Sequence, residues 1–399
     1  MITSFTFAAT PRILFGTGSF NKLPGLISDY GKRVLLVTGG ASFRNSSQYR
    51  RLINQLEEKA LPYFKVGVTT EPSPELIDQT VNIFMEEKIE LVVAIGGGSV
   101  IDAGKAISAM LPLRESVLTY IEGVGAGKIH PGEKLPFIAV PTTSGTGSEA
   151  TNNAVLSRIG KKGFKKSLRH DHFIPNIALL DPRLTLSCPA GITAASGLDA
   201  FVQLLEAYTS TNASAMTDSL ILDAIQIANK CLIPACTDQS QNINVRTGMA
   251  YASLISGIAL TNAGLGVIHG LASPLGGYLK IPHGVVCGTL LAEVVKTNVN
   301  SLLATENPDN PYLQKYARLG GLLVLGQTNP ELNNKTIKSY CQLLVQQLES
   351  WLKLLKIPRL SQYGATEKDL PKIIEKTGQK NNPVELSADQ LTQILKNRL

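Results

Sequence analysis

The chain has 399 residues, of which 44% are hydrophobic, 17% charged and 6% aromatic, and its formal net charge is +7. This length favours two domains, and the composition is that of a globular protein, not a disordered or fibrous one. No basic run is interleaved with aromatic residues, so nucleic-acid binding is disfavoured.

Strands and helices alternate over the first half of the chain. Amphipathic spacing predicts helices at 51–60 and 74–88. Short, apolar runs predict strands at 33–38, 63–68, 90–95, 136–140 and 176–181. Buried strands that are joined through helices predict a parallel sheet covered on both faces. In such sheets ligands bind beyond the carboxyl ends of the strands, where this chain has three Gly-rich polar loops.

The loop TGGASFR (38–44) follows the first of these strands. An acidic residue near this point would hold the ribose 2′-hydroxyl of NAD, but the chain has Gly39 and Gly40, with Ser42 and Arg44 close behind. Hydroxyl and guanidinium groups in place of a carboxylate favour a 2′-phosphate. The loop therefore predicts NADP(H) as the coenzyme, with NAD(H) as the alternative.

The second loop, GGGSVIDAGKA (96–106), lacks the usual GxGxxG fingerprint of a dinucleotide site. Gly97 and Gly98 nevertheless allow a close approach of the backbone to an anion. Ser99, with Asp102 three residues later, resembles a capping box at the start of a helix. A pyrophosphate would lie against the free N–H groups of that helix end. A tight turn without a ligand is the alternative.

The third loop, PTTSGTGSEAT (141–151), has six hydroxyl groups and two glycines in eleven residues. So many short donors suit phosphate and ribose contacts, and a solvated loop is the alternative. A basic cluster follows without an acid between its ends, and it predicts the solvated face of a hairpin from which one lysine could reach the cofactor. Its members are Arg158, Lys161, Lys162, Lys165, Lys166 and Arg169.

The pattern becomes helical from about Asp181 onward, with no convincing strand. Helices are predicted at 192–209, 215–233, 244–261, 264–279 and 284–300. The apolar stretch 250–279 is broken by polar residues, so it predicts a buried helix pair and not a membrane span. We therefore expect an α/β dinucleotide-binding domain at 1–184 and an α-helical metal- and substrate-binding domain at 185–399. The polar tail from about 356 carries little chemical signal.

Two of the five histidines, His269 and His283, lie in a Gly-rich apolar stretch downstream of a helix that carries Asp199. Imidazole and carboxylate are standard ligands for a divalent metal, and three of them leave a position open for a substrate. These residues therefore predict a metal site. Hydrogen-bonded core histidines and a helix-capping aspartate are the alternative.

The cysteines indicate the compartment. There are five, an odd number, with no CxxC spacing: Cys188, Cys231, Cys236, Cys287 and Cys341. They predict free thiols in a reducing environment. The N-terminus shows no signal-peptide pattern, so we expect a cytoplasmic protein.

Several motifs, in order over roughly residues 10–300, resemble the iron-containing (group III) alcohol dehydrogenase family. They are GGGSVID, PTTSGTGSEAT, DPRLTLSCP, GLDAF and HGLASPLGGYLKIPHG. The resemblance implies a dehydroquinate synthase-like fold, in which a Rossmann-like nucleotide-binding domain precedes a helical metal-binding domain and the active site lies in the cleft between them. It also implies a homodimer and NAD(P)-linked interconversion of alcohols with aldehydes or ketones.

The resemblance also implies roles for single residues. Asp199, His269 and His283 match three metal ligands of the family and are the candidate catalytic residues. The residues implied around coenzyme and substrate are Gly97, Gly98 and Ser99 at the pyrophosphate, Thr142, Thr143 and Thr146 at the phosphates and the nicotinamide side, Lys165 at the ribose, and Asn153 beside the substrate.

Two positions depart from the family pattern. Gln203 stands where the iron-dependent members have a histidine ligand, and its i, i+4 spacing from Asp199 makes its amide oxygen a candidate, weaker metal ligand. Ser273 stands where the family commonly has a histidine that transfers protons. A hydroxyl can pass a proton through water, but it cannot act as a base near neutral pH.

The sequence therefore predicts an oxidoreductase in which Fe²⁺ or Zn²⁺ acts as a Lewis acid on a small alcohol or its carbonyl product during hydride transfer. A metal-independent reductase of the same fold, similar to the maleylacetate reductases, is one alternative. A synthase-type lyase, or a nucleotide-binding relative with weakened activity, is another.

Overall fold

The structure, a computed structural model, describes residues 4–399. Contacts divide them into two compact units, Phe7–Cys188 and Pro189–Leu399, and residues 4–6 group with the second unit. The division thus falls four residues beyond the boundary expected after residue 184. Residues 4–6 were expected in the α/β unit but group with the helical one.

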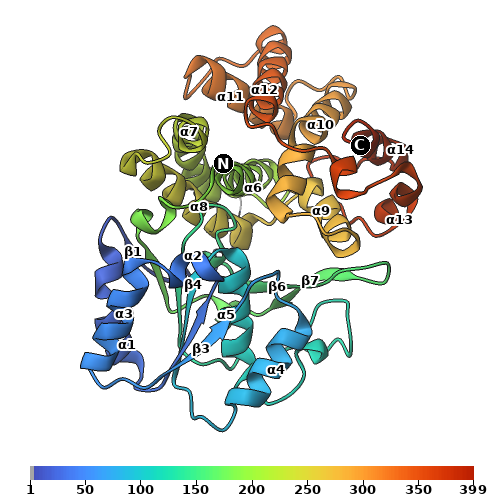
Figure 1. Ribbon diagram of the computed structural model, residues 1–399. Helices are drawn as coiled ribbons and strands as arrows, with labels where there is room; N and C mark the ends of the chain where they lie inside the picture. Colours follow the sequence, from blue (N-terminus) through green and yellow to red (C-terminus); the bar gives the residue numbers. More distant parts are fainter. Residues whose placement is uncertain (1–3) are drawn as a thin grey trace. The chain divides into compact units, whose positions relative to one another are not determined.

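The first unit is built on a six-stranded parallel sheet (Figure 1) with the strand order β1-β8-β5-β4-β2-β3. Its strands are β1 (Arg12–Phe15), β2 (Val34–Thr38), β3 (Tyr63–Gly67), β4 (Leu91–Gly96), β5 (Phe137–Pro141) and β8 (Ile177–Leu180). The five predicted strands are confirmed. The sequence does not predict β1, because this short edge strand is largely exposed and lacks a buried apolar run.

Alternate residues of the strands contribute to two separate cores. Leu35 and Val37 pack on one face of the sheet, and Val34 and Leu36 pack on the other. Helices cover both faces, as predicted, because burying apolar surface is the main stabilising contribution to such a layered unit. These helices are α1 (Leu23–Tyr30), α3 (Ser47–Glu58), α4 (Pro74–Phe84) and α5 (Gly98–Met110), and a short α2 (Ala41–Arg44) follows β2.

The predicted basic hairpin is also confirmed. Strands β6 (Asn153–Arg158) and β7 (Phe164–Arg169) pair antiparallel. Most of its basic side chains are exposed, whereas Lys165 is buried and pairs with Glu71.

Lys105 of α5 anchors the start of this hairpin. Its side chain is fully buried, and its Nζ donates hydrogen bonds of 2.7–2.8 Å to the backbone carbonyls of Ser148, Thr151 and Asn153. Burial lowers the pKa of Lys105 to about 8, and the buried carboxyl groups of Asp102 and Glu149 oppose this shift. Such a charge is tolerated inside a protein only because hydrogen-bond acceptors and opposite charge surround it.

The second unit is helical. Its helices are α6 (Ala190–Thr209), α7 (Ala215–Cys236), α8 (Ile243–Ala263), α9 (Val267–Tyr278), α10 (His283–Leu303), α11 (Pro311–Leu325), α12 (Asn334–Leu354), α13 (Leu370–Glu375) and α14 (Ala388–Lys396). The five predicted helices are confirmed, whereas the last four were not predicted. The polar tail is therefore structured, and its helices α13 and α14 pack against α9 and α10.

Helix α6 lies inside this unit and packs against α7, α8, α10 and α11. The stretch 250–279 forms a helix pair, α8 and α9, with a bend of 100° between them. Among the described residues, α7, and α8 with α9 if they count as one span, are long and apolar enough to cross a membrane. Core helices of soluble proteins pass the same test, so this finding is weak evidence for a span.

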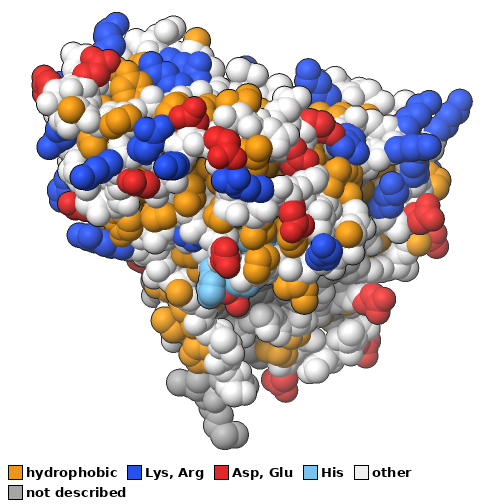
Figure 2. Space-filling view, turned by 90° about the horizontal axis from the view of Figure 1, so that it is seen from below, with side chains coloured by type: hydrophobic (Ala, Val, Ile, Leu, Met, Phe, Trp, Pro, Cys, Tyr) orange, Lys and Arg blue, Asp and Glu red, His pale blue; other side chains and the backbone are white. Residues whose placement is uncertain are grey.

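The surface shows no dominance of one charge on the face drawn in Figure 2, where acidic and basic side chains are interspersed. The expectation that the chain does not bind nucleic acid stays a prediction.

Replacing Lys105 by methionine should destabilise the α/β unit. The substitution removes the donor from three backbone carbonyls and the counter-charge from Glu149, and breaking a buried charge network in this way typically costs about 3–5 kcal/mol. Thermal and urea unfolding measure the effect. Lys162→Met, in the exposed hairpin turn, is the control and should leave stability unchanged. Equal stability of the two variants would contradict the role given to Lys105.

Candidate metal centre

Helix α6 presents three buried polar side chains along one face. Asp199, Gln203 and Glu206 follow one another at i, i+4 and i+7, and none is more than 4% exposed. Because α6 is surrounded by other helices, each of these groups needs a partner inside the protein.

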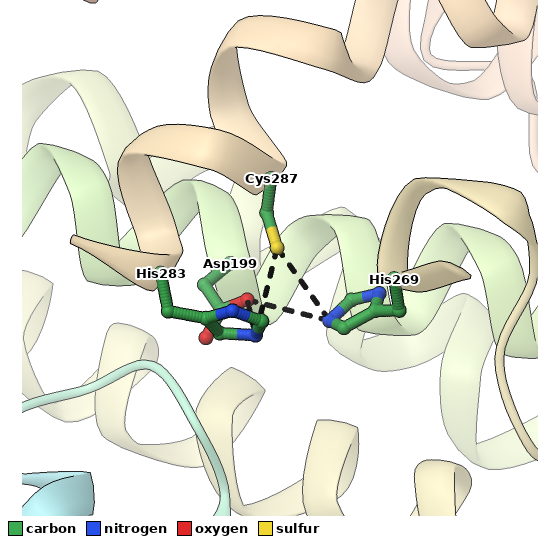
Figure 3. A group of neighbouring side chains, drawn as sticks. All are labelled: Asp199, His269, His283 and Cys287. Carbon is green, nitrogen blue, oxygen red and sulfur yellow. Dashed lines mark hydrogen bonds and ion pairs between the residues drawn. The ribbon is translucent and has the colours of Figure 1, made fainter. Parts of the chain in front are cut away.

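Asp199 lies in a cluster of four possible metal ligands (Figure 3). Its Oδ1 is 3.5 Å from His269 Nε2 on α9 and 3.7 Å from His283 Nε2 on α10. Cys287 Sγ lies 3.7 Å from each of these two nitrogens. All four donor atoms are within 4.8 Å of one another. The structure thus brings together the three predicted ligands and adds a fourth residue that the sequence analysis does not identify.

The start of α10 places two members of the cluster. His283 is the first residue of the helix and Cys287 follows one turn later on the same face. Gly284 allows this helix to approach α6 closely, because a Cβ at this position would lie 2.3 Å from the carbonyl oxygen of Ala195. A side chain here would push the two helices apart and separate His283 from Asp199.

Glu206 orients His269. One carboxylate oxygen lies 2.6 Å from His269 Nδ1, and the other accepts a hydrogen bond of 2.6 Å from the backbone N–H of Ile268. A carboxylate that holds the second ring nitrogen is the usual support of a histidine ligand, because it directs the other nitrogen to the metal. Glu206 was not predicted, because its spacing of seven residues from Asp199 places it on the same helix face but does not reveal its contact with His269.

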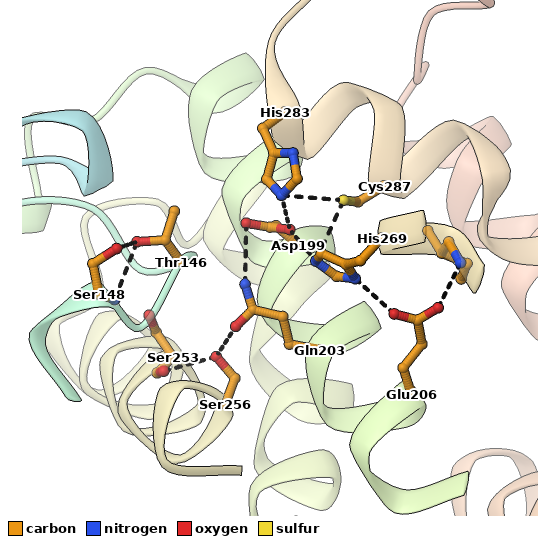
Figure 4. Close-up of polar contacts among 11 residues, drawn as sticks. Thr146, Ser148, Asp199, Gln203, Glu206, Ser253, Ser256, His269, His283 and Cys287 are labelled. Carbon is orange, nitrogen blue, oxygen red and sulfur yellow. Dashed lines mark hydrogen bonds and ion pairs between the residues drawn. The ribbon is translucent and has the colours of Figure 1, made fainter. Parts of the chain in front are cut away.

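Gln203 contacts Asp199 through its amide nitrogen, which donates to Oδ2 over 3.4 Å (Figure 4). Its amide oxygen accepts a hydrogen bond of 2.9 Å from Ser256 Oγ. The amide oxygen of Gln203, which was predicted to bind the metal, is therefore hydrogen-bonded to Ser256. This arrangement gives no support to Gln203 as a ligand. Ser273 lies on α9, one turn after His269, and its part in proton transfer stays a prediction.

The charges of the cluster are coupled. Burial alone would raise the pKa of Asp199, but His283 and His269 outweigh it and lower the pKa to about 2. Burial alone would lower the pKa of His269, but Cys287, Glu206 and Asp199 raise it well above its usual value. Burial raises the pKa of the Cys287 thiol to about 12. Metal binding must displace any proton that the coordinating atoms of His269 and Cys287 carry.

The cluster fits a divalent metal. Asp199 Oδ1 is buried and accepts no hydrogen bond, although two imidazole nitrogens lie near it. Nitrogen–oxygen separations of 3.5 Å and 3.7 Å are too long for good hydrogen bonds, whereas they suit atoms that share one ion.

The glycine loop of the α/β unit fits a phosphate group. Helix α5 begins at Gly98, and no side chain caps its N-terminus. The predicted capping box is therefore wrong, because Gly97 is the N-cap and Ser99 lies inside the helix. Asp102 instead accepts a hydrogen bond from the backbone of Val155, and burial raises its pKa. An uncapped helix N-terminus that follows a glycine turn suits an anion.

The threonine loop lies against this turn. A Cβ at Gly98 would come within 2.6 Å of Thr146 Oγ1, so only glycine allows the contact. Thr146 Oγ1 also accepts hydrogen bonds from the backbone and hydroxyl of Ser148. Thr142 and Thr143 precede it, directly after β5. The two predicted phosphate loops thus come together in the α/β unit, and the contacts of these residues with a coenzyme stay predictions.

The remaining predicted coenzyme residues have varied environments. Gly39 and Gly40 follow β2, and Ser42 is exposed on α2. Arg44 donates a hydrogen bond of 2.7 Å to Thr38 Oγ1, at the carboxyl end of the same strand.

Two further predicted residues lie in the hairpin itself. Asn153 donates a hydrogen bond of 3.0 Å to Ser167 Oγ, and Lys165 pairs with Glu71. Their predicted roles at the substrate and the ribose stay untested by these contacts.

Residues 10–182 match the iron-containing alcohol dehydrogenases, and residues 193–399 match the C-terminal region of the Fe-containing alcohol dehydrogenase family. Alcohol dehydrogenase 4 of Saccharomyces cerevisiae is 32% identical over 401 residues, which cover 98% of this chain and 97% of the yeast protein.

Two further relatives differ in the coenzyme that their names give. The NAD-dependent methanol dehydrogenase of Bacillus methanolicus is 26% identical over 98% of this chain and 99% of its own. The NADPH-dependent butanol dehydrogenase of Clostridium saccharobutylicum is 29% identical over 96% of this chain and 95% of its own. The crystal structure of an archaeal alcohol dehydrogenase from a Red Sea brine pool superimposes with a TM-score of 0.88 at 26% identity, covering 100% of this chain and 99% of that one.

Glu206→Gln should weaken metal binding by about 10–100-fold, the usual cost of losing the group that orients a histidine ligand. An amide cannot accept hydrogen bonds from both His269 and Ile268, because one of its two ends is a donor. Titration of zinc against a chromophoric chelator measures the dissociation constant. Glu375→Gln replaces an exposed carboxylate of the same unit and serves as the control. Unchanged affinity in Glu206→Gln would show that Glu206 does not support the site.

Proposed function

Since the chain belongs to the iron-containing alcohol dehydrogenase family, we propose that it is an NADP(H)-dependent enzyme that interconverts a small alcohol and its aldehyde or ketone at a divalent metal site. Membership of the family also confirms the predicted fold class, a Rossmann-like unit with a helical C-terminal unit. The observation that carries the proposal is the convergence of Asp199, His269 and His283 on one buried point.

The residues of the helical unit prepare this point for a metal. Asp199, His269 and His283 would hold the ion, which when bound would polarise the substrate oxygen and stabilise negative charge on it. Glu206 keeps His269 Nε2 directed into the cluster, and Gln203 holds the Oδ2 atom of Asp199 so that Oδ1 remains for the ion.

Access and proton transfer follow from the same residues. The side chain of His283 is 27% exposed, whereas the other members of the cluster are nearly fully buried, so a substrate would reach the cluster on the His283 side. We propose that the substrate proton leaves through water and hydroxyl groups, with Ser273 as a candidate.

The coenzyme preference rests on the loop after β2. Residues 38–44 include no carboxylate that could bind a ribose 2′-hydroxyl, while Ser42 is exposed and Arg44 is held at the carboxyl end of the strand. A 2′-phosphate would meet a hydroxyl and a guanidinium there. The named coenzymes of the relatives include both NAD and NADPH, so they do not decide between them.

We also propose that the enzyme works in the cytoplasm as a homodimer. None of the five cysteines, all of which the structure describes, forms a disulfide, which suits a reducing compartment. The dimer is proposed only from the resemblance to the family.

His269→Ala should abolish turnover of short alcohols and aldehydes together with bound metal, because it removes one ligand and leaves Glu206 without its partner. Elemental analysis of anaerobically prepared protein and the absorbance of NADPH measure the two effects. His172→Ala, an exposed histidine, should change neither. Full turnover of His269→Ala, or of metal-free wild-type protein, would contradict the metal mechanism and favour the metal-independent reductase.

Arg44→Ala should lower kcat/KM for NADPH by about 10–100-fold, the loss that corresponds to a hydrogen bond with a charged group, and should leave kcat/KM for NADH unchanged. The wild type should prefer NADPH. Arg51→Ala, an exposed arginine of α3, is the control. A preference of the wild type for NADH, or an equal loss with both coenzymes, would contradict the assignment of the 2′-phosphate to this loop.

A further inference from the structure

We infer that Cys287 is a protein ligand of the metal, so that the centre is an Asp–His–His–Cys site suited to zinc and Gln203 positions the carboxylate without binding the ion. The inference rests on the proposed function, because it concerns the same site.

Four of the six distances between the donor atoms are close to those of a tetrahedral centre. Oxygen, nitrogen and sulfur ligands bind zinc at about 2.0–2.3 Å, so two donors on a tetrahedral ion stand about 3.3–3.6 Å apart. Oδ1 of Asp199 is 3.5 Å and 3.7 Å from the two imidazole nitrogens, and Sγ of Cys287 is 3.7 Å from both. The two remaining donor–donor distances are at most 4.8 Å, so all four atoms lie close enough to close around one ion.

The surroundings of Cys287 differ from those of an ordinary core cysteine. Its side chain is fully buried, and its sulfur lies between His269 Nε2 and His283 Nε2 (Figure 3). A thiol has a single proton, so it can donate to only one of the two nitrogens. Cys341, the other buried cysteine, is 3.9 Å from the carbonyl oxygen of Leu313 and makes no such contact with histidine.

Asp199 provides the independent sign of a ligand. Its Oδ1 atom is buried and has no hydrogen-bond partner, and it points into the cluster. The two imidazoles help to balance its charge but are too distant for good hydrogen bonds, and a shared cation would remove the remaining cost of burial.

Gln203 then has a defined task. Its amide nitrogen donates a hydrogen bond to Asp199 Oδ2, and its amide oxygen accepts one from Ser256 Oγ. Both ends of the amide are therefore engaged by groups other than the ion (Figure 4). With Oδ2 held in this way, Oδ1 is the oxygen left for the ion. The ligand missing at position 203 is thus replaced from another helix, by Cys287 of α10.

The donor set favours zinc. A thiolate is a soft ligand that selects zinc over harder ions, and imidazole with carboxylate completes a common zinc set. Coordination removes the thiol proton, which passes to solvent, so burial of Cys287 in the metal-free chain does not prevent the bond.

Cobalt substitution tests the inference without use of turnover. Wild-type protein loaded with Co²⁺ should show the near-ultraviolet charge-transfer absorption of a thiolate–cobalt bond. Cys287→Ala and Cys287→Ser should lose this band and bind zinc at least about 10-fold more weakly. Removing a ligand should weaken binding at least as much as removing a group that only orients a ligand. Cys341→Ser, a buried cysteine of the same unit, is the matched control and should keep band and affinity. Gln203→Ala should keep the band.

The outcomes separate the two proposals. A wild-type protein that binds Co²⁺ without the band, or a Cys287→Ala variant that keeps it, would overturn the role of Cys287 and leave the metal mechanism intact. A wild type that binds neither cobalt nor zinc would overturn both. Circular dichroism of each variant identifies a loss of binding that comes from unfolding.

Discussion

The burial of one carboxylate, that of Asp199, is the constraint on which the helical unit depends. Helix α6 is enclosed by its neighbours, so the charge on Asp199 cannot be solvated and must be balanced by groups from other helices. Helices α9 and α10 supply His269 and His283, and the glycine at position 284 lets α10 come close enough to α6. The packing of these helices therefore sets the distances between the ligands of the centre. A change that relaxes the packing also separates the ligands.

The α/β unit meets the same constraint in a different way. Its buried Lys105 is balanced by backbone carbonyls and by Glu149, and it fixes the start of the hairpin. The ion pair of Lys165 with Glu71 adds a second contact of the hairpin with the rest of the unit. These buried charges stabilise the scaffold, whereas the uncapped start of α5 leaves N–H groups for a phosphate. In the α/β unit, the buried charges of Lys105 and Lys165 thus stabilise the fold, whereas the N–H groups at the start of α5 remain for a ligand.

The sequence predicts the elements whose signal is local. Buried apolar runs gave five strands of the sheet, and helical spacing gave α6 to α10, but the exposed β1 and the polar helices α13 and α14 lack these signals. Asp199, His269 and His283 could be recognised by residue type. Glu206 and Cys287 could not be assigned, because only the tertiary structure brings Glu206 to His269 and Cys287 to both imidazoles. For the same reason the sequence does not reveal the hydrogen bond of Gln203 with Ser256.

The central claim is that a divalent metal binds to Asp199, His269, His283 and Cys287. X-ray absorption at the zinc edge measures the ligands directly in the loaded wild-type protein. The account predicts one sulfur at about 2.3 Å and nitrogen or oxygen ligands at about 2.0–2.2 Å around each zinc. A shell of nitrogen and oxygen alone would contradict the thiolate centre, and a protein that retains no zinc after dialysis would contradict the metal site itself.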